Sequence, residues 1–236
     1  MCRIIGKIGL KKEPIEYEML KAPHSLLYMS QKGRQPEGGR GTHGDGWGIA
    51  YRKDREIQIR KSGRPAYEDK NFRESASNVI TDLFIGSVRL ASPGIPVTKE
   101  NAHPFQVGDL ALVHNGTIKK GLPRYGESDT LDFLRWISKN WNRENEDLIK
   151  LLKKTSDSWT YTSLSFLMMN GEKLYVFRQT MEDPKKLSYY TLYTFRSEES
   201  FLIASEPLDD KDWGLLTNGT LLIIQSPEKW EKMSIR

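Results

Sequence analysis

The sequence predicts a single α+β domain in which antiparallel sheets carry helices on their outer sides. Apolar runs of strand length come in pairs around short turns, and helical patterns fall between blocks of strands. No linker, internal repeat or low-complexity tract divides the 236 residues. A hydrophobic content of 37% and an aromatic content of 10% are enough to fill one sizeable core. We therefore expect one domain over residues 1–236.

The strands are predicted from short apolar runs, several of which alternate apolar and polar residues. Asn170-Gly171 between two such runs is the strongest short hairpin signal, and residues 52–55 separate another pair. The expected strands are 3–9, 49–51, 56–60, 83–89, 110–114, 162–169, 173–178, 191–195, 201–204 and 220–225, and residues 101–105 are expected to be extended.

The helices are predicted from apolar residues at helical spacing. Ser128 is a good N-cap and is followed by such a pattern through Ile137. Pro23 interrupts an earlier pattern. The expected helices are a short one within 17–29 that ends near Ser30, one over 72–80, one that begins at Ser128 and one over 148–152; residues 10–16 are expected to be a polar turn region, and residues 31–42 a long glycine-rich loop.

Composition and charge exclude several classes of function. The net charge is +5, but Lys and Arg are scattered among Asp and Glu and form no basic stripe, so we expect no nucleic-acid partner. No run approaches the ~18 apolar residues of a membrane span, and no secretory signal pattern opens the chain. Four scattered histidines and one cysteine suggest no metal, and no nucleotide-binding motif suggests a cofactor. The expected location is the cytoplasm.

The chemistry is expected to centre on Cys2, the only cysteine of the chain. Aminopeptidases remove Met1 when a small residue follows, which would leave Cys2 with a free α-amine beside its thiol. Unperturbed, the two groups titrate near ~8.5 and ~7.7–8.0, so the amine can take the thiol proton. One residue would then supply both nucleophile and base. A lone cysteine is also commonly just a small buried hydrophobe, and Cys2 alone does not decide between the two.

Polar residues at strand ends provide the remaining parts of a site. Arg89 can grip a carboxylate with two hydrogen bonds, and Asp129 can pair with an ammonium. Asn115 and Gly116 can offer a side-chain amide and a main-chain N–H to an oxyanion. Each also has an ordinary structural explanation: an ion pair for Arg89, a hairpin turn for Asn115-Gly116, and the helix dipole for Asp129. Together with Cys2 they describe a site for an amino acid and an acyl transfer.

In chain order, several motifs resemble the glutaminase domain of the class-II glutamine amidotransferases. The matching stretches are Met1-Cys2-Arg3, Gly44–Ala50, Gly86–Arg89, Asn101–Phe105, His114–Gly116, Ser128–Thr130 and Ala204–Leu208. The last resembles a segment of the small stand-alone members. The resemblance covers most of the chain and implies the N-terminal-nucleophile hydrolase fold, a four-layer αββα sandwich of two antiparallel sheets.

The resemblance implies a role for each site residue. Cys2 attacks the side-chain amide of glutamine or of a γ-glutamyl compound, and its α-amine acts first as base and then as acid. Asn115 and Gly116 form the oxyanion hole. Arg89 holds the α-carboxylate and Asp129 the α-amine. Water then hydrolyses the γ-glutamyl thioester to glutamate.

Other motif residues match the family less closely or carry no chemistry. Ser92 offers a hydroxyl where many members have Thr, and no His follows it. Trp47 is expected to pack and His103 to support the fold. The Gly44–Gly48 segment is expected near the nucleophile.

Three functions remain open at the level of the sequence. The chain can be the glutaminase partner of a separate synthase subunit that uses the ammonia. It can be a stand-alone amidohydrolase of γ-glutamyl peptides. It can also be an inert binding subunit that keeps the fold, which retention of Met1 would favour. The sequence does not identify an ammonia acceptor or an oligomeric state.

Overall fold

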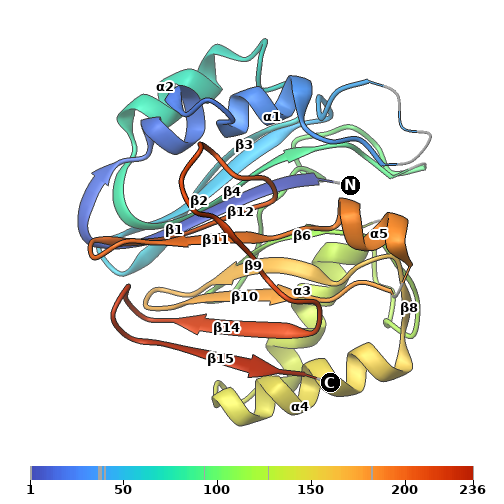
Figure 1. Cartoon of the computed structure of the whole chain (residues 1–236). Coiled ribbons are helices and arrows are strands. Elements are labelled where there is room, and N and C mark those ends of the chain that lie inside the picture. Colours follow the sequence, from blue (N-terminus) through green and yellow to red (C-terminus); the bar gives the residue numbers. More distant parts are fainter. Residues whose placement is uncertain are drawn as a thin grey trace.

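The computed structural model describes residues 2–36, 39, 41–92, 94–126, 128–181 and 183–235. Two antiparallel sheets face each other and helices cover both outer sides (Figure 1). Helices α1 (Leu26–Lys32) and α2 (Lys70–Asn78) cover the first sheet, and α3 (Asp129–Asn140) and α4 (Asn145–Ser158) cover the second. The expected αββα sandwich is thereby confirmed.

The first sheet has the order β13-β11-β12-β1-β4-β2-β3. Its longest strands are adjacent, because β1 pairs with β4 and β4 pairs with β2. The strands are β1 (Cys2–Pro14), β2 (Trp47–Lys53), β3 (Glu56–Ser62), β4 (Ile80–Arg89), β11 (Tyr193–Arg196), β12 (Ser200–Ala204) and β13 (Gly214–Leu215).

The second sheet has the order β15-β14-β10-β9-β6-β5, and a separate short pair joins β7 to β8. The remaining elements are β5 (Phe105–Val107), β6 (Leu110–Asn115), β7 (Ile118–Lys120), β8 (Thr160–Tyr161), β9 (Ser165–Met169), β10 (Leu174–Arg178), β14 (Thr220–Ile224), β15 (Trp230–Ser234), α5 (Pro184–Tyr189) and a π-helical turn, η1 (Tyr17–Lys21).

The apolar residues divide into three clusters that follow the layers. One lies between the sheets, where Cys2, Ile4 and Ile8 of β1 meet β6, β9 and β10. The other two lie under the helices on either side. Because side chains alternate along a strand, β1 supplies two layers at once: Cys2 points between the sheets, and its neighbour Arg3 points to the helical side.

Several predicted boundaries differ from the structure. Residues 10–16 were expected to be a turn, but β1 continues to Pro14, after a register shift between Ile8 and Glu13. This part of β1 is largely exposed, so it lacks the apolar pattern that marks a strand. Residues 101–105 were expected to be extended, yet 101–103 lie in turns and bends and the strand begins at Phe105.

The helical segment of residues 17–29 splits on either side of Pro23 into η1 and α1, and α1 continues to Lys32 rather than ending near Ser30. The glycine-rich loop at 31–42 lies partly outside the described residues, because residues 37, 38 and 40 are not among them.

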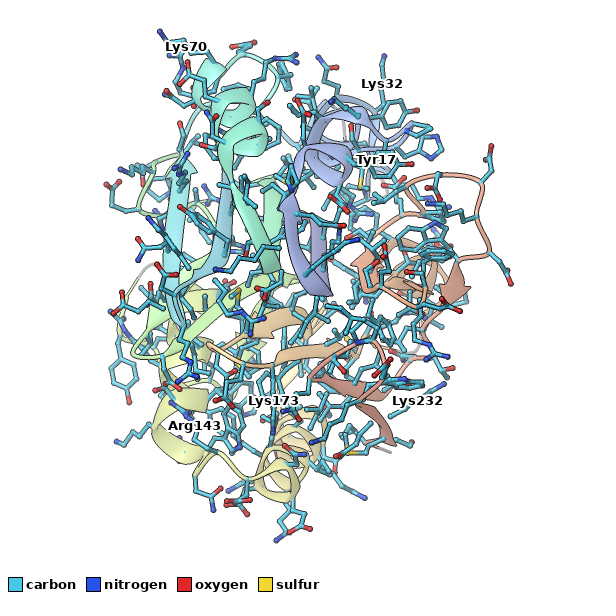
Figure 2. The ribbon with its side chains drawn as sticks, turned by 90° about the vertical axis from the view of Figure 1, so that its left-hand side faces the viewer. Tyr17, Lys32, Lys70, Arg143, Lys173 and Lys232 are labelled. Carbon is cyan, nitrogen blue, oxygen red and sulfur yellow. The ribbon has the colours of Figure 1, made fainter. Side chains whose placement is uncertain are left out.

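The tips of two hairpins, one from each sheet, meet at the end of the sandwich away from Cys2. Arg52 of β2 donates from Nη1 to the carbonyl of Gly171 across 3.0 Å. The same guanidinium donates from Nε to Asp82 Oδ1 of β4 across 2.9 Å. Figure 2 looks at this end of the molecule, with Lys173 labelled just after the second tip. The contact fixes the two sheets to each other at this end.

Candidate active site

The strand ends opposite these tips bring the expected site residues together. Cys2 begins β1 and is the register partner of Arg89, the last residue of β4. Asn115 ends β6 in the facing sheet, and Asp129 begins α3. One cavity collects these elements and is lined by Cys2, Arg89, Leu90, Ser92, Ile95, Asn101, His103, His114, Gly116, Ser128, Asp129 and Thr130. Of the expected set, only Asn115 is not in this lining, and it is bonded to Cys2.

Cys2 and Asn115 form the contact between the two sheets. The main-chain nitrogen of Cys2 donates to Asn115 Oδ1 across 2.9 Å. Both residues are buried, with 2% and 1% of their surface exposed. Asn115 Nδ2 is also buried, and no hydrogen-bond acceptor among the described residues pairs with it. The amide thus holds Cys2 with its oxygen and keeps two N–H donors for another group.

Among the described residues, the imidazole of His103 contacts the thiol of Cys2. Its Nδ1 lies 3.7 Å from Cys2 Sγ. Burial, with the nearby charge of Arg89, holds the pKa of His103 well below its ordinary value. The ring is therefore neutral at pH 7, and its free nitrogen can accept a weak hydrogen bond from the thiol.

Gly116 occupies a position that only glycine fits. A Cβ built there would lie 2.0 Å from the carbonyl oxygen of Ser163. His114, just before Asn115, accounts for part of this crowding. Its Nε2 lies 3.0 Å from the same Ser163 carbonyl, and its Nδ1 lies 3.0 Å from Thr130 Oγ1. A carbonyl can only accept, so Nε2 carries the proton of this ring. Burial lowers the pKa of His114, which is consistent with a neutral imidazole.

Arg89 is held by the glycine-rich segment that the sequence placed near the nucleophile. The main chain of Arg89 exchanges two 2.9 Å hydrogen bonds with Asp45 and Gly46. Its Nη1 faces the carbonyls of Pro96 at 3.2 Å and Asp45 at 3.4 Å. No carboxylate among the described residues forms an ion pair with this guanidinium. Arg89 therefore brings a nearly buried positive charge to the cavity, with no counter-ion among the residues that the structure describes.

Asp129 and Ser92 lie on other walls of the cavity. Asp129 is buried at the N-terminus of α3, where the helix dipole favours a carboxylate. Its two oxygens accept from the main-chain nitrogens of Ile118 at 2.7 Å and Thr130 at 2.9 Å. Each oxygen retains a further lone pair for a cation. Ser92 Oγ lies 3.2 Å from Thr117 Oγ1 and remains half-buried.

The cavity is narrow. Its free volume is about 20 Å³, which is room for about one water molecule. Any larger ligand must move the walls. A much larger cleft, about 930 Å³, lies elsewhere, between β3 and α2 on one side and β5 and α3 on the other. It contains none of the expected site residues, so size alone would have pointed to the wrong place.

The sequence interpretation missed two groups of this site. His114 and Thr130 line the cavity, and both stand inside motifs that had been recognised for their neighbours. Trp47 packs as expected: it is buried against Phe72 with ring centres 5.2 Å apart, and its Nε1 donates to Asp69 across 3.0 Å. In the part of the chain that is described, no three His, Cys, Asp or Glu residues are arranged to hold a metal.

The comparison with known families agrees with this geometry. The model of the glutamine amidotransferases class-II matches residues 20–195. The chain belongs to the class-II glutamine amidotransferase family. This membership confirms the resemblance read from the motifs, and with it an enzyme of the amidotransferase type that carries a cysteine at position 2. None of the described helices is long and apolar enough to cross a membrane.

The relatives in this family differ in how much of their length they share with the chain. The γ-glutamyl-hercynylcysteine sulfoxide hydrolase of Mycolicibacterium smegmatis is 27% identical over 213 residues, 89% of each chain. The protein of the same name from Mycobacterium tuberculosis is 25% identical over 91% of this chain and 88% of its own. The glutamine–fructose-6-phosphate aminotransferase of Sulfolobus acidocaldarius is 31% identical, but over only 50% of this chain and 18% of its own.

Solved structures share the fold. The glutamine aminotransferase class-II domain protein of Silicibacter pomeroyi superposes with a TM-score of 0.68 at 20% identity, and the alignment covers 99% of both chains. The glutamine phosphoribosylpyrophosphate amidotransferase of B. subtilis superposes with a TM-score of 0.69 at 21% identity over 100% of this chain and 49% of its own.

Proposed function

We propose that this protein is a stand-alone γ-glutamyl amidohydrolase whose nucleophile is the thiol of Cys2 after removal of Met1. The observation that carries the proposal is the pairing of Cys2 with Asn115. The amide oxygen accepts from the Cys2 nitrogen, and the buried Nδ2 has no hydrogen-bond partner among the described residues. A nucleophile next to a preorganised free donor is the arrangement that acyl transfer requires.

The reaction begins with proton transfer within Cys2. Its free α-amine takes the thiol proton, and the thiolate attacks the carbonyl carbon of the γ-amide. The charge that develops on the oxygen is stabilised by Asn115 Nδ2 and by the main-chain N–H of Gly116. The tetrahedral intermediate collapses, and the ammonium of Cys2 returns the proton to the leaving nitrogen. A γ-glutamyl thioester and free ammonia or amine result.

Hydrolysis of the thioester completes the cycle. The α-amine of Cys2 takes a proton from water, the hydroxide attacks the thioester carbonyl, and glutamate leaves as the thiol is restored. The glutamyl end is bound by groups for which no ion-pair partner is found among the described residues. Arg89 takes the α-carboxylate, Asp129 the α-ammonium, and the hydroxyl of Ser92 contributes a polar contact.

The extent of the similarity favours a hydrolase over a subunit that passes ammonia to a synthase. The relatives that match this chain over nearly nine-tenths of their own length are named as hydrolases. Those named as aminotransferases match over about a fifth of theirs. The substrate class that fits is glutamine or a small γ-glutamyl amide, and a partner synthase is not required for turnover.

The test combines intact mass with turnover. We expect the purified protein to lack Met1 and to gain one adduct with 6-diazo-5-oxo-norleucine. We also expect it to hydrolyse a γ-glutamyl dipeptide faster than glutamine without any partner. Cys2→Ala is the control: it should lose the adduct and the activity while keeping the wild-type unfolding temperature. A mass that retains Met1 with no adduct would support the inert binding subunit instead, and a partner-dependent glutaminase rate would support the synthase subunit.

A further inference from the structure

Three residues that the proposed reaction does not use stand side by side across the first sheet. Lys61 of β3 pairs with Gly48 of β2, and Gly48 pairs with Ser87 of β4. Ser87 pairs in turn with Ile4, which faces the space between the sheets together with Cys2. Residues paired across neighbouring strands project to the same face. The row Lys61–Gly48–Ser87 therefore faces the second sheet.

The segment that carries His103 lies directly on this row. Lys61 Nζ donates to the carbonyl of Ala102 across 2.9 Å and to that of Glu100 across 3.2 Å. Ser87 Oγ donates to the carbonyl of His103 across 3.2 Å. The carbonyls of Ala102 and His103, which flank the Cα of His103, thus accept hydrogen bonds from two different strands, β3 and β4.

Gly48, in the middle of the row, leaves the space into which this segment fits. A Cβ there would lie 2.2 Å from the His103 carbonyl oxygen and 2.8 Å from Pro104 Cδ. Any other residue at position 48 would lift the segment off the sheet. The glycine is therefore required by the close approach of another main chain.

The same segment separates two spaces in the molecule. Asn101 and His103 line the narrow cavity with Cys2, whereas Lys99, Glu100 and Pro104 line the large cleft. His103 Nδ1 reaches the thiol of Cys2 at 3.7 Å. The position of this imidazole therefore depends on how firmly the hydrogen bonds from the first sheet hold the main chain at residues 102–104.

We propose that Lys61, Gly48 and Ser87 form a cradle that positions the imidazole of His103 against the thiol of Cys2. They are positioning residues, since none of them touches the thiol. The ring accepts the S–H at Nδ1 and so orients the sulfur until the α-amine removes the proton. This role in catalysis rests on the proposed hydrolase function; the cradle itself does not.

The chemistry of Lys61 suits a structural clamp. Its ammonium contacts two carbonyls and also lies 4.9 Å from the centre of the Phe105 ring, whose own ring packs 5.1 Å from that of His103. Burial lowers the pKa of Lys61 to about 8, so at pH 7 the ammonium is still the major form and all of its donors are available.

The test compares Lys61→Met with Arg60→Met. Methionine keeps an unbranched apolar stem and removes the ammonium. Arg60 is the next residue of β3, so it points to the opposite face, with its guanidinium 5.9 Å from the ring of Tyr51. We expect Lys61→Met to lower kcat at least about tenfold with KM within a factor of about two, because the nucleophile is misplaced while the glutamyl contacts remain. Arg60→Met should match the wild type, and Lys61→Arg should restore most of kcat.

A second readout does not depend on activity. The chain has four histidines, so ¹⁵N-histidine NMR can follow each imidazole. In the wild type, alkylation of Cys2 should shift the His103 ring signals. In Lys61→Met, and to a smaller extent in Ser87→Ala, that shift should shrink and the pKa of His103 should move up toward its ordinary value.

Two results would overturn the cradle: unchanged His103 signals in Lys61→Met, or the same change in Arg60→Met. If the wild type hydrolyses no γ-glutamyl compound, the proposed function fails, and the NMR comparison still decides whether Lys61 and Ser87 hold His103.

Discussion

The main-chain nitrogen of Cys2 donates a hydrogen bond to Oδ1 of Asn115 across 2.9 Å, although 113 residues separate the two in sequence. The bond joins the first strand of one sheet to the end of a strand in the other. Because it uses the amide oxygen, it leaves Nδ2 of Asn115 available as a donor. The orientation of one side chain thus serves both the position of the nucleophile and the donor beside it.

Replacing Asn115 should therefore affect the rate more than binding. Asn115→Asp keeps an acceptor for the Cys2 nitrogen and removes the Nδ2 donor, whereas Asn115→Ala removes both. We expect kcat to fall by about 10²–10³ in each variant, the loss typical of one oxyanion donor. Steady-state kinetics with a γ-glutamyl dipeptide measures this. An Asn115→Asp enzyme with wild-type kcat would mean that Nδ2 stabilises no charge in the transition state.

Replacing Arg89 should weaken the affinity of the enzyme for the α-carboxylate of the substrate. Arg89→Lys keeps the charge but loses the two-pronged donor geometry, so KM for glutamine should rise about tenfold or more with a smaller change in kcat. The matched substrate is 4-aminobutanamide, which is glutamine without its α-carboxylate. Wild type and variant should hydrolyse it equally. If Arg89→Lys impaired both substrates alike, Arg89 would be a structural residue held by Asp45 and Pro96.

Gly116 should tolerate no side chain. Gly116→Ala would place a methyl group 2.0 Å from the Ser163 carbonyl oxygen. The main chain must shift to relieve this contact, which should cost about 1–3 kcal/mol or more in unfolding free energy. Gly126→Ala is the control, since the nearest atom to its added methyl group would be 3.8 Å away. Urea unfolding of the two variants should differ clearly, and equal midpoints would contradict the contact.

Stability should fall in mild acid because of His43. This ring is buried beside Gln35, and burial together with the charge of Arg3 lowers its pKa to about 3. In the unfolded chain His43 takes up a proton near pH ~6.5, whereas in the folded chain it does not. The contribution of His43 to the free energy of unfolding is therefore fully present above that pH. It should decline as pH falls toward 3, by about 2 kcal/mol between pH 6.5 and 5.

Urea midpoints at pH 7 and pH 5 measure this loss. His43→Asn should lower stability at pH 7 and make its dependence on pH less steep, while the buried His103 and His114, whose pKa values are also lowered, keep part of that dependence. The exposed His24 is the control, and His24→Asn should leave the slope as it is in the wild type. An unchanged slope in His43→Asn would exclude His43 as the source.

The strands around the site were predictable because they are buried on both faces and therefore carry unbroken apolar runs, as in 83–89 and 110–114. The end of β1 was missed because Lys11 and Lys12 are exposed there and show no such pattern. The family motifs indicated Cys2, Arg89 and Asn115 but not the distances between them in the folded chain. The contact of His103 with Cys2 depends on strand register and on the space at Gly48, which a single sequence does not reveal.

The hairpin tips joined through Arg52 and Gly171 have a mechanical consequence. They tie the two sheets at one end, while the opposite end is spanned by the hydrogen bond between Cys2 and Asn115. A ligand that widens the narrow cavity would therefore move the two sheets apart at the Cys2 end while Arg52 holds them together at the other. Weakening the contact of Arg52 with Gly171 should change how easily the sheets separate at the catalytic end, without altering any group that touches the substrate.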